Sequence, residues 1–352
     1  MKMILSSLLA MGAAALQAAC CDESPCPEKT VCPEKPYPKV KNCRDYNIVP
    51  FADFLYWRFS SPNLVYGRDG VGVRGAAESA VASGTSYYPD FEYDPGFKAG
   101  LGIKFGPSKA FDFVGIYCWL HSTPEGSISG SPISATFLPV NFFNSGTAAT
   151  NSYSYASMGL DLTFNWAELQ SGYSFAVNRY LLLRPYIALA AIFIDGDLDA
   201  HYEYTTPGLV FHVARTHGKC DSWSVGPKAG LDFFGRATDN WGVYLNVNLT
   251  QQISHIRMKT TETQEDPAAG TIFDIQKGRL VENRNIGLFS LEFGPTFDAW
   301  LYCDKIHLHL RATYGASNLN GGANLSFLNS NNTDLFEQSE FRGLNVRGLI
   351  EF

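Results

Sequence analysis

The chain has 352 residues, of which 45% are hydrophobic, 14% aromatic and only 17% charged, and its formal net charge is −7. This composition excludes a disordered, collagen-like or histone-like protein, and the acidic balance argues against nucleic acid as a partner. Beyond the first twenty residues no run of 18 apolar residues occurs, which excludes helical membrane spans in the mature chain. Convincing amphipathic helices are also lacking, so the many aromatic residues need another structural explanation.

The N-terminus is typical of a cleaved signal peptide. A short positive region precedes an apolar core at residues 4–16 that is too short to anchor the chain permanently. Small residues predict cleavage after Ala18, and Gln17 disfavours the alternative of a lipid attached to Cys20. We therefore expect an exported protein with residues 1–18 as its signal peptide.

Residues 19–46 are expected to form a flexible periplasmic arm rich in cysteine and proline. Its prolines prevent regular structure, and it repeats Cys-Pro-Glu-Lys at 26–29 and 32–35 without any C-x-x-C pair. In an exported chain this pattern favours disulfides over zinc. Five of the eight cysteines lie in the arm and cannot all pair with one another, so we expect bonds to the barrel, to a second copy or to other envelope proteins. The disulfide candidates are Cys20, Cys21, Cys26, Cys32, Cys43 and, in a short turn, Cys303.

From Ile48 onward, apolar and polar residues alternate with period two. In residues 97–105 the odd positions are apolar and the even positions are lysine or glycine. The same alternation marks residues 159–166, 222–233, 241–249, 289–298 and 305–312. It is typical of β-strands with one apolar and one polar face. In residues 159–166 it predicts that Leu160, Leu162, Phe164 and Trp166 face lipid and that Asp161 faces the lumen.

The connections between these strands alternate between short and long. Short ones are expected at residues 106–110, 178–179, 235–239 and 301–304, and long ones at 60–94, 121–152, 196–220, 257–284 and 316–339. Short and long turns on opposite rims are typical of outer-membrane barrels. We predict an all-β fold for residues 47–352, a transmembrane antiparallel β-barrel of about ten strands, or twelve if alternating runs inside 60–94 and 196–220 add hairpins. The alternative for these runs is that they extend the barrel above the membrane.

Aromatic residues near the strand ends are expected to form the girdles of such a barrel. They are Trp57, Phe59, Trp119, Trp166, Tyr173, Trp223, Trp241, Trp300 and Tyr314. The chain ends on Phe352, a terminal aromatic of the type that barrel assembly machinery reads. A secreted β-sandwich would alternate in the same way. The alternating loop lengths, Phe352 and the glycines on the polar face favour a barrel in the outer membrane of a Gram-negative-type bacterium.

Several segments, in order, resemble the Legionella-type major outer membrane proteins and their MOMP-like relatives in chlamydia-like bacteria. They are the Leu-Arg-Pro-Tyr-Ile segment at 183–187, the strand at 224–232 and the closing strands that contain 291–294, 303–307 and 343–348. The resemblance covers roughly residues 48–352. It implies a pore-forming outer-membrane protein.

The charged residues expected on the lumen face are nearly balanced in sign, and the strand with His307 and His309 adds two imidazoles. With no partner carboxylate evident in the sequence, we interpret this histidine pair as pore lining rather than a metal site. The pore-lining candidates are Lys98, Lys104, Asp161, Glu168, Arg184, Lys228, Asp232, Glu292, Asp298, Lys305, His307, His309, Arg311, Arg347 and Glu351.

No nucleophile elbow is present, and the glycines of residues 100–106 have the wrong spacing for a dinucleotide loop. We therefore expect no catalytic residues, no cofactor and no enzymatic activity. The prediction is a porin-like protein that resides in outer-membrane lipid and passes small hydrophilic solutes with weak charge selectivity. Because ten strands give a narrow lumen at best, the alternative is a structural or adhesive envelope protein with a plugged barrel, cross-linked by disulfides.

Overall fold

The computed structural model describes residues 46–62, 64–69, 85–135, 153–205, 211–266, 270–301, 306–320 and 338–351. All of them belong to the second of two units, which begins at Val40. The expected signal peptide, most of the arm with its five cysteines, and Cys303, Lys305 and Phe352 lie outside the described residues. Within the described ranges no helix is long and apolar enough to cross a membrane.

Nearly all described residues lie in strands, and the one helical element is a short 3-10 turn, η1 (Pro107–Lys109). The strands are β1 (Tyr46–Ser60), β2 (Gly67–Asp69), β3 (Ser86–Tyr87), β4 (Tyr93–Phe105), β5 (Phe111–Ser122), β6 (Glu125–Ala135), β7 (Tyr153–Tyr173), β8 (Phe175–Ala176), β9 (Leu181–Thr205), β10 (Phe211–Arg236), β11 (Trp241–Asp266), β12 (Thr271–Leu301), β13 (Ile306–Asn320) and β14 (Gln338–Glu351).

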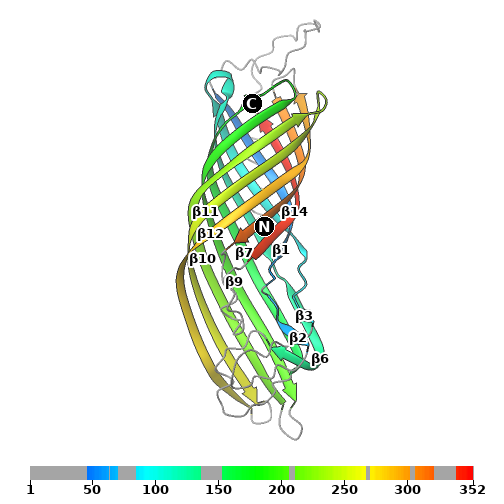
Figure 1. Ribbon diagram of the computed structural model, residues 1–352, viewed down its shortest axis with the longest axis vertical. Coiled ribbons are helices and arrows are strands. Elements are labelled where there is room, and N and C mark those ends of the chain that lie inside the picture. Colours follow the sequence, from blue (N-terminus) through cyan, green and yellow to red (C-terminus); the bar gives the residue numbers. More distant parts are fainter. Residues whose placement is uncertain are drawn as a thin grey trace. The chain divides into compact units, whose positions relative to one another are not determined.

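Ten of these strands close into an antiparallel barrel, which confirms the predicted fold class and strand number. The ring runs β1, β14, β13, β12, β11, β10, β9, β7, β5, β4 and back to β1, and the β7–β9 pairing closes it. The short strands β2, β3 and β6 add to the end of β7 that is far from the short turns, as Figure 1 shows. No additional barrel hairpin forms in the described parts of 60–94 and 196–220.

Four barrel strands are much longer than a bilayer requires. β9, β10, β11 and β12 have 25, 26, 26 and 31 residues, whereas about 9–11 residues span a membrane. Residues 196–220 and 257–284 were expected to be long connections, but the β9–β10 pairing continues to Thr205 and the β11–β12 pairing to Asp266. For 196–220 the outcome is the alternative in which its alternating runs extend the barrel above the membrane. In residues 196–220 and 257–284 the outward side chains are mostly polar. These residues therefore lack the apolar outer face by which the other parts of the barrel strands were recognised in the sequence.

The part of the wall nearer the short turns has an apolar outer face and is called the membrane section here. On β11 the membrane section covers residues 241–253, where Val243, Leu249 and Ile253 are 42%, 63% and 63% exposed on the outside. The inward side chains that alternate with them, such as Asn246 and Gln252, are polar and buried. The corresponding stretches are 167–173 on β7, 183–193 on β9, 223–233 on β10 and 287–297 on β12.

The continuation of the long strands, called the extension here, has the opposite pattern. It comprises residues 153–166 of β7, 194–205 of β9, 211–222 of β10, 254–266 of β11 and 271–286 of β12. On β9 the outward residues become acidic, with Asp195 and Asp199 exposed, while Ile194 and Leu198 are buried inside. The extension is therefore built like a water-soluble sheet that is closed around an apolar core.

This reversal corrects the predicted orientation of β7. Leu160, Leu162, Phe164 and Trp166 were expected to face lipid, but all four are buried inside the barrel. Asp161, predicted to line the pore, instead lies on the outer face with its side chain 62% exposed. The sequence shows the same alternation of apolar and polar residues in both sections. Whether the apolar or the polar residues point inward depends on whether lipid or water surrounds the outer face.

The predicted aromatic girdle is likewise correct for some residues and wrong for others. Trp223, Trp241 and Tyr314 lie on the outer face of the membrane section. Trp57 and Phe59, together with Trp166, are only 4–9% exposed and belong to the interior.

Candidate functional site

A cluster of ionisable side chains lies inside the barrel at the end with the short turns, which is the periplasmic rim in proteins of this architecture. His307 Nε2 and His309 Nδ1 both lie 2.9 Å from Asp298 Oδ1. Glu351 accepts a hydrogen bond from Lys104 Nζ at 2.7 Å and lies 3.8 Å from His307 Nδ1. The histidines thus have the carboxylate partner that the sequence did not reveal. No metal-binding group of three or more His, Cys, Asp or Glu residues occurs among the described residues.

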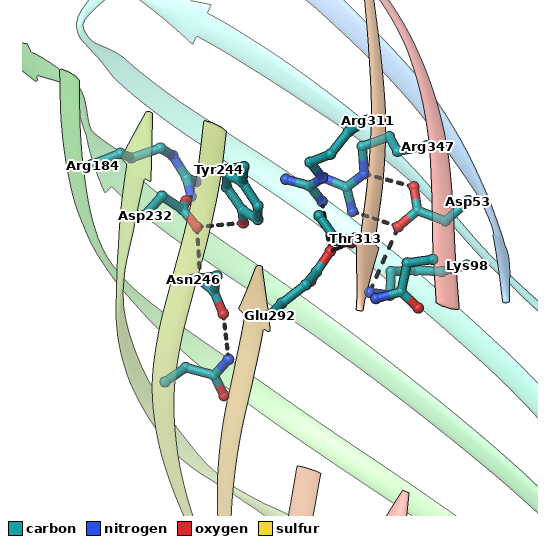
Figure 2. Close-up of polar contacts among 12 residues, drawn as sticks. Asp53, Lys98, Arg184, Asp232, Tyr244, Asn246, Glu292, Arg311, Thr313 and Arg347 are labelled. Carbon is teal, nitrogen blue, oxygen red and sulfur yellow. Dashed lines mark hydrogen bonds and ion pairs between the residues drawn. The ribbon is translucent and has the colours of Figure 1, made fainter. Parts of the chain in front are cut away.

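Further into the lumen, one side of the wall carries Arg184 between two aspartates. Its guanidinium donates to Asp112 at 2.6 and 2.7 Å and to Asp232 at 2.7 Å. Asp232 also accepts hydrogen bonds from Tyr244 Oη at 2.6 Å and Asn246 Nδ2 at 2.7 Å. Figure 2 shows Arg184, Asp232, Tyr244 and Asn246 as one connected group. With two carboxylates around one guanidinium, this side has one excess negative charge.

The side of the lumen that faces the Arg184 group has one excess positive charge. Arg347 binds Asp53 through two hydrogen bonds of 2.6 and 2.7 Å, and Lys98 Nζ lies 3.6 Å from the same carboxylate. Arg311, directly opposite Arg347 on the neighbouring strand, has an ion pair of 3.3 Å with Glu292. Three cations and two carboxylates therefore meet on this side, as Figure 2 shows. Opposite excess charges on two sides of a lumen create a field across it.

A third mid-lumen group links strands that are two places apart in the barrel. Lys228 on β10 donates to Glu168 on β7 at 2.6 Å, and Gln170 donates to the other oxygen of Glu168 at 2.6 Å. Lys228 Nζ lies 4.7 Å from the centre of the Trp166 ring. Trp166 marks the inner border of the polar membrane section, because the inward residues that precede it on β7 are apolar.

An apolar layer closes the interior on the far side of Trp166. Phe164 on β7 contacts Phe341 on β14 with ring centroids 4.7 Å apart, and Phe59 lies 5.2 Å from the same Phe341 ring. β7 and β14 are four places apart in a ring of ten strands, so the Phe164–Phe341 contact crosses the lumen. Leu120, Ile192, Ile286, Leu288 and Leu319 belong to the same buried cluster.

Between the ion pairs and the apolar layer the inward side chains enclose a cavity of about 110 Å³. Lys98, Trp166, Arg311 and Asn248 are among its lining residues. This volume has room for several waters. The lumen is thus filled by side chains to the extent expected for a small barrel.

Thirteen of the fifteen predicted pore-lining residues point into the barrel: Lys98, Lys104, Glu168, Arg184, Lys228, Asp232, Glu292, Asp298, His307, His309, Arg311, Arg347 and Glu351. They fall into the periplasmic cluster and the three mid-lumen groups described above. Asp161 faces outward, and Lys305 lies outside the described residues.

Sequence reasoning missed two central carboxylates, Asp53 and Asp112. Both are buried, at 2% and 4% exposure, and each binds an arginine across the inner wall. Asp53 is a single charge among the apolar odd positions of β1, which include Val49 and Leu55. A lone carboxylate on an otherwise apolar face was the available signal, because lipid would not accept it.

Comparison with known proteins identifies the family. The family described as Legionella pneumophila major outer membrane protein precursor matches residues 50–284, about two thirds of the chain. The chain belongs to this family. The protein is accordingly an outer-membrane β-barrel, as the resemblance in the sequence had implied. The search of curated proteins gives no match.

Solved structures that are similar to this chain have distant sequences. The outer membrane protease OmpT from Escherichia coli is 10% identical, with 89% of this chain and 99% of that chain covered and a TM-score of 0.38. A FadL homologue from Pseudomonas aeruginosa is 6% identical over 88% and 90% of the two chains, with a TM-score of 0.26. The translocator domain of NalP from Neisseria meningitidis is 10% identical over 89% of both, with a TM-score of 0.28. These values carry no argument about activity.

Proposed function

We propose that this member of the Legionella-type family is a narrow, gated channel for small hydrophilic solutes, and that the described conformation is its closed state. The observation that carries the proposal is the sequence of environments along the lumen. A charged, hydrogen-bonding section leads from the periplasmic rim to the apolar core of the extension, whose first layer includes Trp57, Phe164 and Phe341. A hydrophobic constriction of this kind gates by excluding water, and it opens when the ring of apolar side chains widens.

The proposed channel has weak charge selectivity. Seven cationic residues point into the described membrane section and periplasmic rim: Lys98, Lys104, Lys109, Arg184, Lys228, Arg311 and Arg347. Seven carboxylates face them: Asp53, Asp112, Glu168, Asp232, Glu292, Asp298 and Glu351. Because the two signs nearly cancel, we expect less than about a tenfold preference between anions and cations in a reversal-potential measurement.

The gate is tested by shortening the two rings that meet across the lumen. In planar bilayers, wild-type protein should show rare, small openings, and the double variant Phe164→Ala/Phe341→Ala should raise the open probability by at least about tenfold, because the water-excluding layer is lost. Phe289→Ala is the matched control, since Phe289 is 44% exposed on the lipid-facing side. Each sample is first shown to be folded by heat-dependent mobility on gels.

A second function, that of a plugged structural or adhesive barrel, is supported by the close packing of Phe164 against Phe341 and by the long extension beyond the membrane section. If folded wild-type and folded double variant both carried no current at any voltage, this second function would replace the channel. A current that the double variant enlarges and the Phe289 control does not would support the channel.

A further inference from the structure

The outer face of the extension carries a group of exposed cations just beyond the lipid-facing surface. Lys219 on β10 lies directly opposite Lys259 on β11, which in turn lies directly opposite Arg279 on β12. Arg257, the preceding outward residue of β11, lies between this row and the membrane section, and all four residues are exposed. β10, β11 and β12 lie side by side in Figure 1. These four residues are called the basic patch here.

The row of three cations has little neutralising charge from its own neighbours. Within the described ranges neither Lys259 nor Arg279 has an ion pair. Lys219 has a long one, with 3.5 Å between its Nζ and Asp197 Oδ2. Like charges directly opposite one another in a sheet are destabilising, so the row costs stability unless an anion from outside the chain neutralises it.

Carboxylates are also scarce on the surrounding outer face. No outward position in residues 253–261 of β11 or 277–289 of β12 is Asp or Glu. Asp221 lies directly opposite Arg257, so with Asp197 there are two carboxylates beside the four cations of the basic patch. The other acidic residues of this part of the outer face lie on β7 and β9 and include Asp161, Asp195 and Asp199. The outer face is thus divided into an acidic and a basic side.

The basic patch begins where the lipid-facing surface ends. Trp223 on β10 is 48% exposed and lies directly opposite His255 on β11, with ring centres 5.7 Å apart. Arg257 Nε donates to His255 Nε2 at 3.1 Å, so the indole, the imidazole and the guanidinium form one continuous outward surface. Exposed tryptophans mark the membrane–water interface. Arg257 and Lys259 lie two and four residues beyond this level, which is about 7 and 13 Å along the tilted strands.

We propose that the basic patch binds the anionic headgroup of a phosphorylated glycolipid in the outer leaflet, such as lipopolysaccharide. The chain belongs to an outer-membrane family and its short turns are periplasmic, so this border faces the outer leaflet. The phosphates and sugars of such a headgroup extend outward from the acyl chains, past the level of Trp223. Ile253 and Phe289, which are 63% and 44% exposed below the patch, contact the acyl chains. The proposal goes beyond the channel function and does not depend on it.

Binding of lipopolysaccharide to protein refolded in a nonionic detergent tests the patch without any need for flow. The probe is fluorescently labelled lipopolysaccharide with a short phosphorylated core, followed by anisotropy. EDTA in the buffer prevents divalent cations from bridging the probe to acidic residues. The double variant Lys259→Gln/Arg279→Gln should weaken the affinity about tenfold to thirtyfold, because each cation near an anionic surface contributes about fivefold. Both residues are exposed, so the variant should fold, which heat-dependent mobility on gels measures.

The matched control is Arg179→Gln/Arg215→Gln, which removes the same charge outside the basic patch. Arg215 lies farther along the outward face of β10 with its side chain 59% exposed, and Arg179 lies in a short turn at the periplasmic rim. The control should weaken the affinity less than about twofold, because charges more than about 10 Å apart are largely screened. Digalactosyldiacylglycerol, a glycolipid without phosphate, should not displace the probe.

An equal loss in both double variants would show an effect of net charge alone and overturn the site, and so would an unchanged affinity in the patch variant. Displacement of the probe by millimolar inorganic phosphate at constant ionic strength would show a site for free anions and overturn lipid docking. Cross-linked wild-type dimers that the patch variant loses, with its lipid affinity unchanged, would assign the patch to the acidic side of a second copy. All these results are independent of conductance, so failure of the channel and failure of the lipid site are distinguishable.

Discussion

The membrane section and the extension are made of the same strands, yet their inner and outer faces have exchanged chemistry. On β9 the outward residues change from Ile187 and Leu189 to Asp195 and Asp197, and the inward ones change from Arg184 to Ile194. Strand geometry and pairing continue unchanged through this border. The alternation therefore encodes the strand, while the surrounding solvent decides which face is apolar.

The inner face of the membrane section depends on paired charges, and removing one partner should have the largest effect. Asp53→Asn leaves Arg347 and Lys98 without their shared carboxylate in the buried lumen. We expect a loss of about 3–5 kcal/mol in the free energy of unfolding. Asp161→Asn, on the outer face of the extension, should change stability by less than about 0.5 kcal/mol. Urea titration of both variants in vesicles measures the contrast, and equal losses would contradict it.

On the outer face, a new charge should destabilise the membrane section and not the extension. Leu249→Arg places a charge on the membrane section at a position that is 63% exposed to lipid. It should cost about 2–4 kcal/mol near the middle of the bilayer. Thr261→Arg lies on the same face of the same strand, in the extension, where water solvates the new charge. Folding yield and stability in vesicles should be normal for Thr261→Arg, and a comparable loss in both would mean that the extension is also embedded.

Inside the barrel, apolar packing should matter in the extension and polar complementarity in the membrane section. Ile256 is 1% exposed in a small cluster with Met258 and Cys220, so Ile256→Ala should cost about 2–4 kcal/mol. Thr250 is also inward and buried, but its Oγ1 has no hydrogen-bond partner among the described residues. Thr250→Val should therefore be neutral or stabilise by about 1 kcal/mol. The same urea titrations compare the two variants, and a stability loss in Thr250→Val similar to that of Ile256→Ala would contradict the difference.

Most of the barrel could be predicted because period-two alternation and turn lengths are local signals. The ten strands, and the inward direction of residues such as Lys98 and Arg347, follow from them. The orientation of Asp161 and the full length of β9 could not be predicted, because the sequence does not state where the membrane ends. The Phe164–Phe341 contact depends on closure of the ring, which joins positions that are distant in the sequence. The Asp298 bridge is local, because Asp298 lies directly opposite His309 in the β12–β13 pair, and the strand register could have revealed it.

The smallest expected effect concerns pH, and it arises in the extension. Glu262 is 1% exposed, neither of its carboxylate oxygens has a partner among the described residues, and burial raises its pKa to about 7 from 4.5. The folded state therefore holds a proton that the unfolded chain releases between about pH 4.5 and 7, so stability is fully present below that range and falls as pH rises through it. Glu262→Gln should raise stability only slightly at pH 5, near the start of that range, and by about 1 kcal/mol at pH 8. Thermal unfolding of both proteins at the two pH values measures the difference. An equal change at pH 5 and pH 8 would show that Glu262 is ionised in the folded extension and that its pocket admits water.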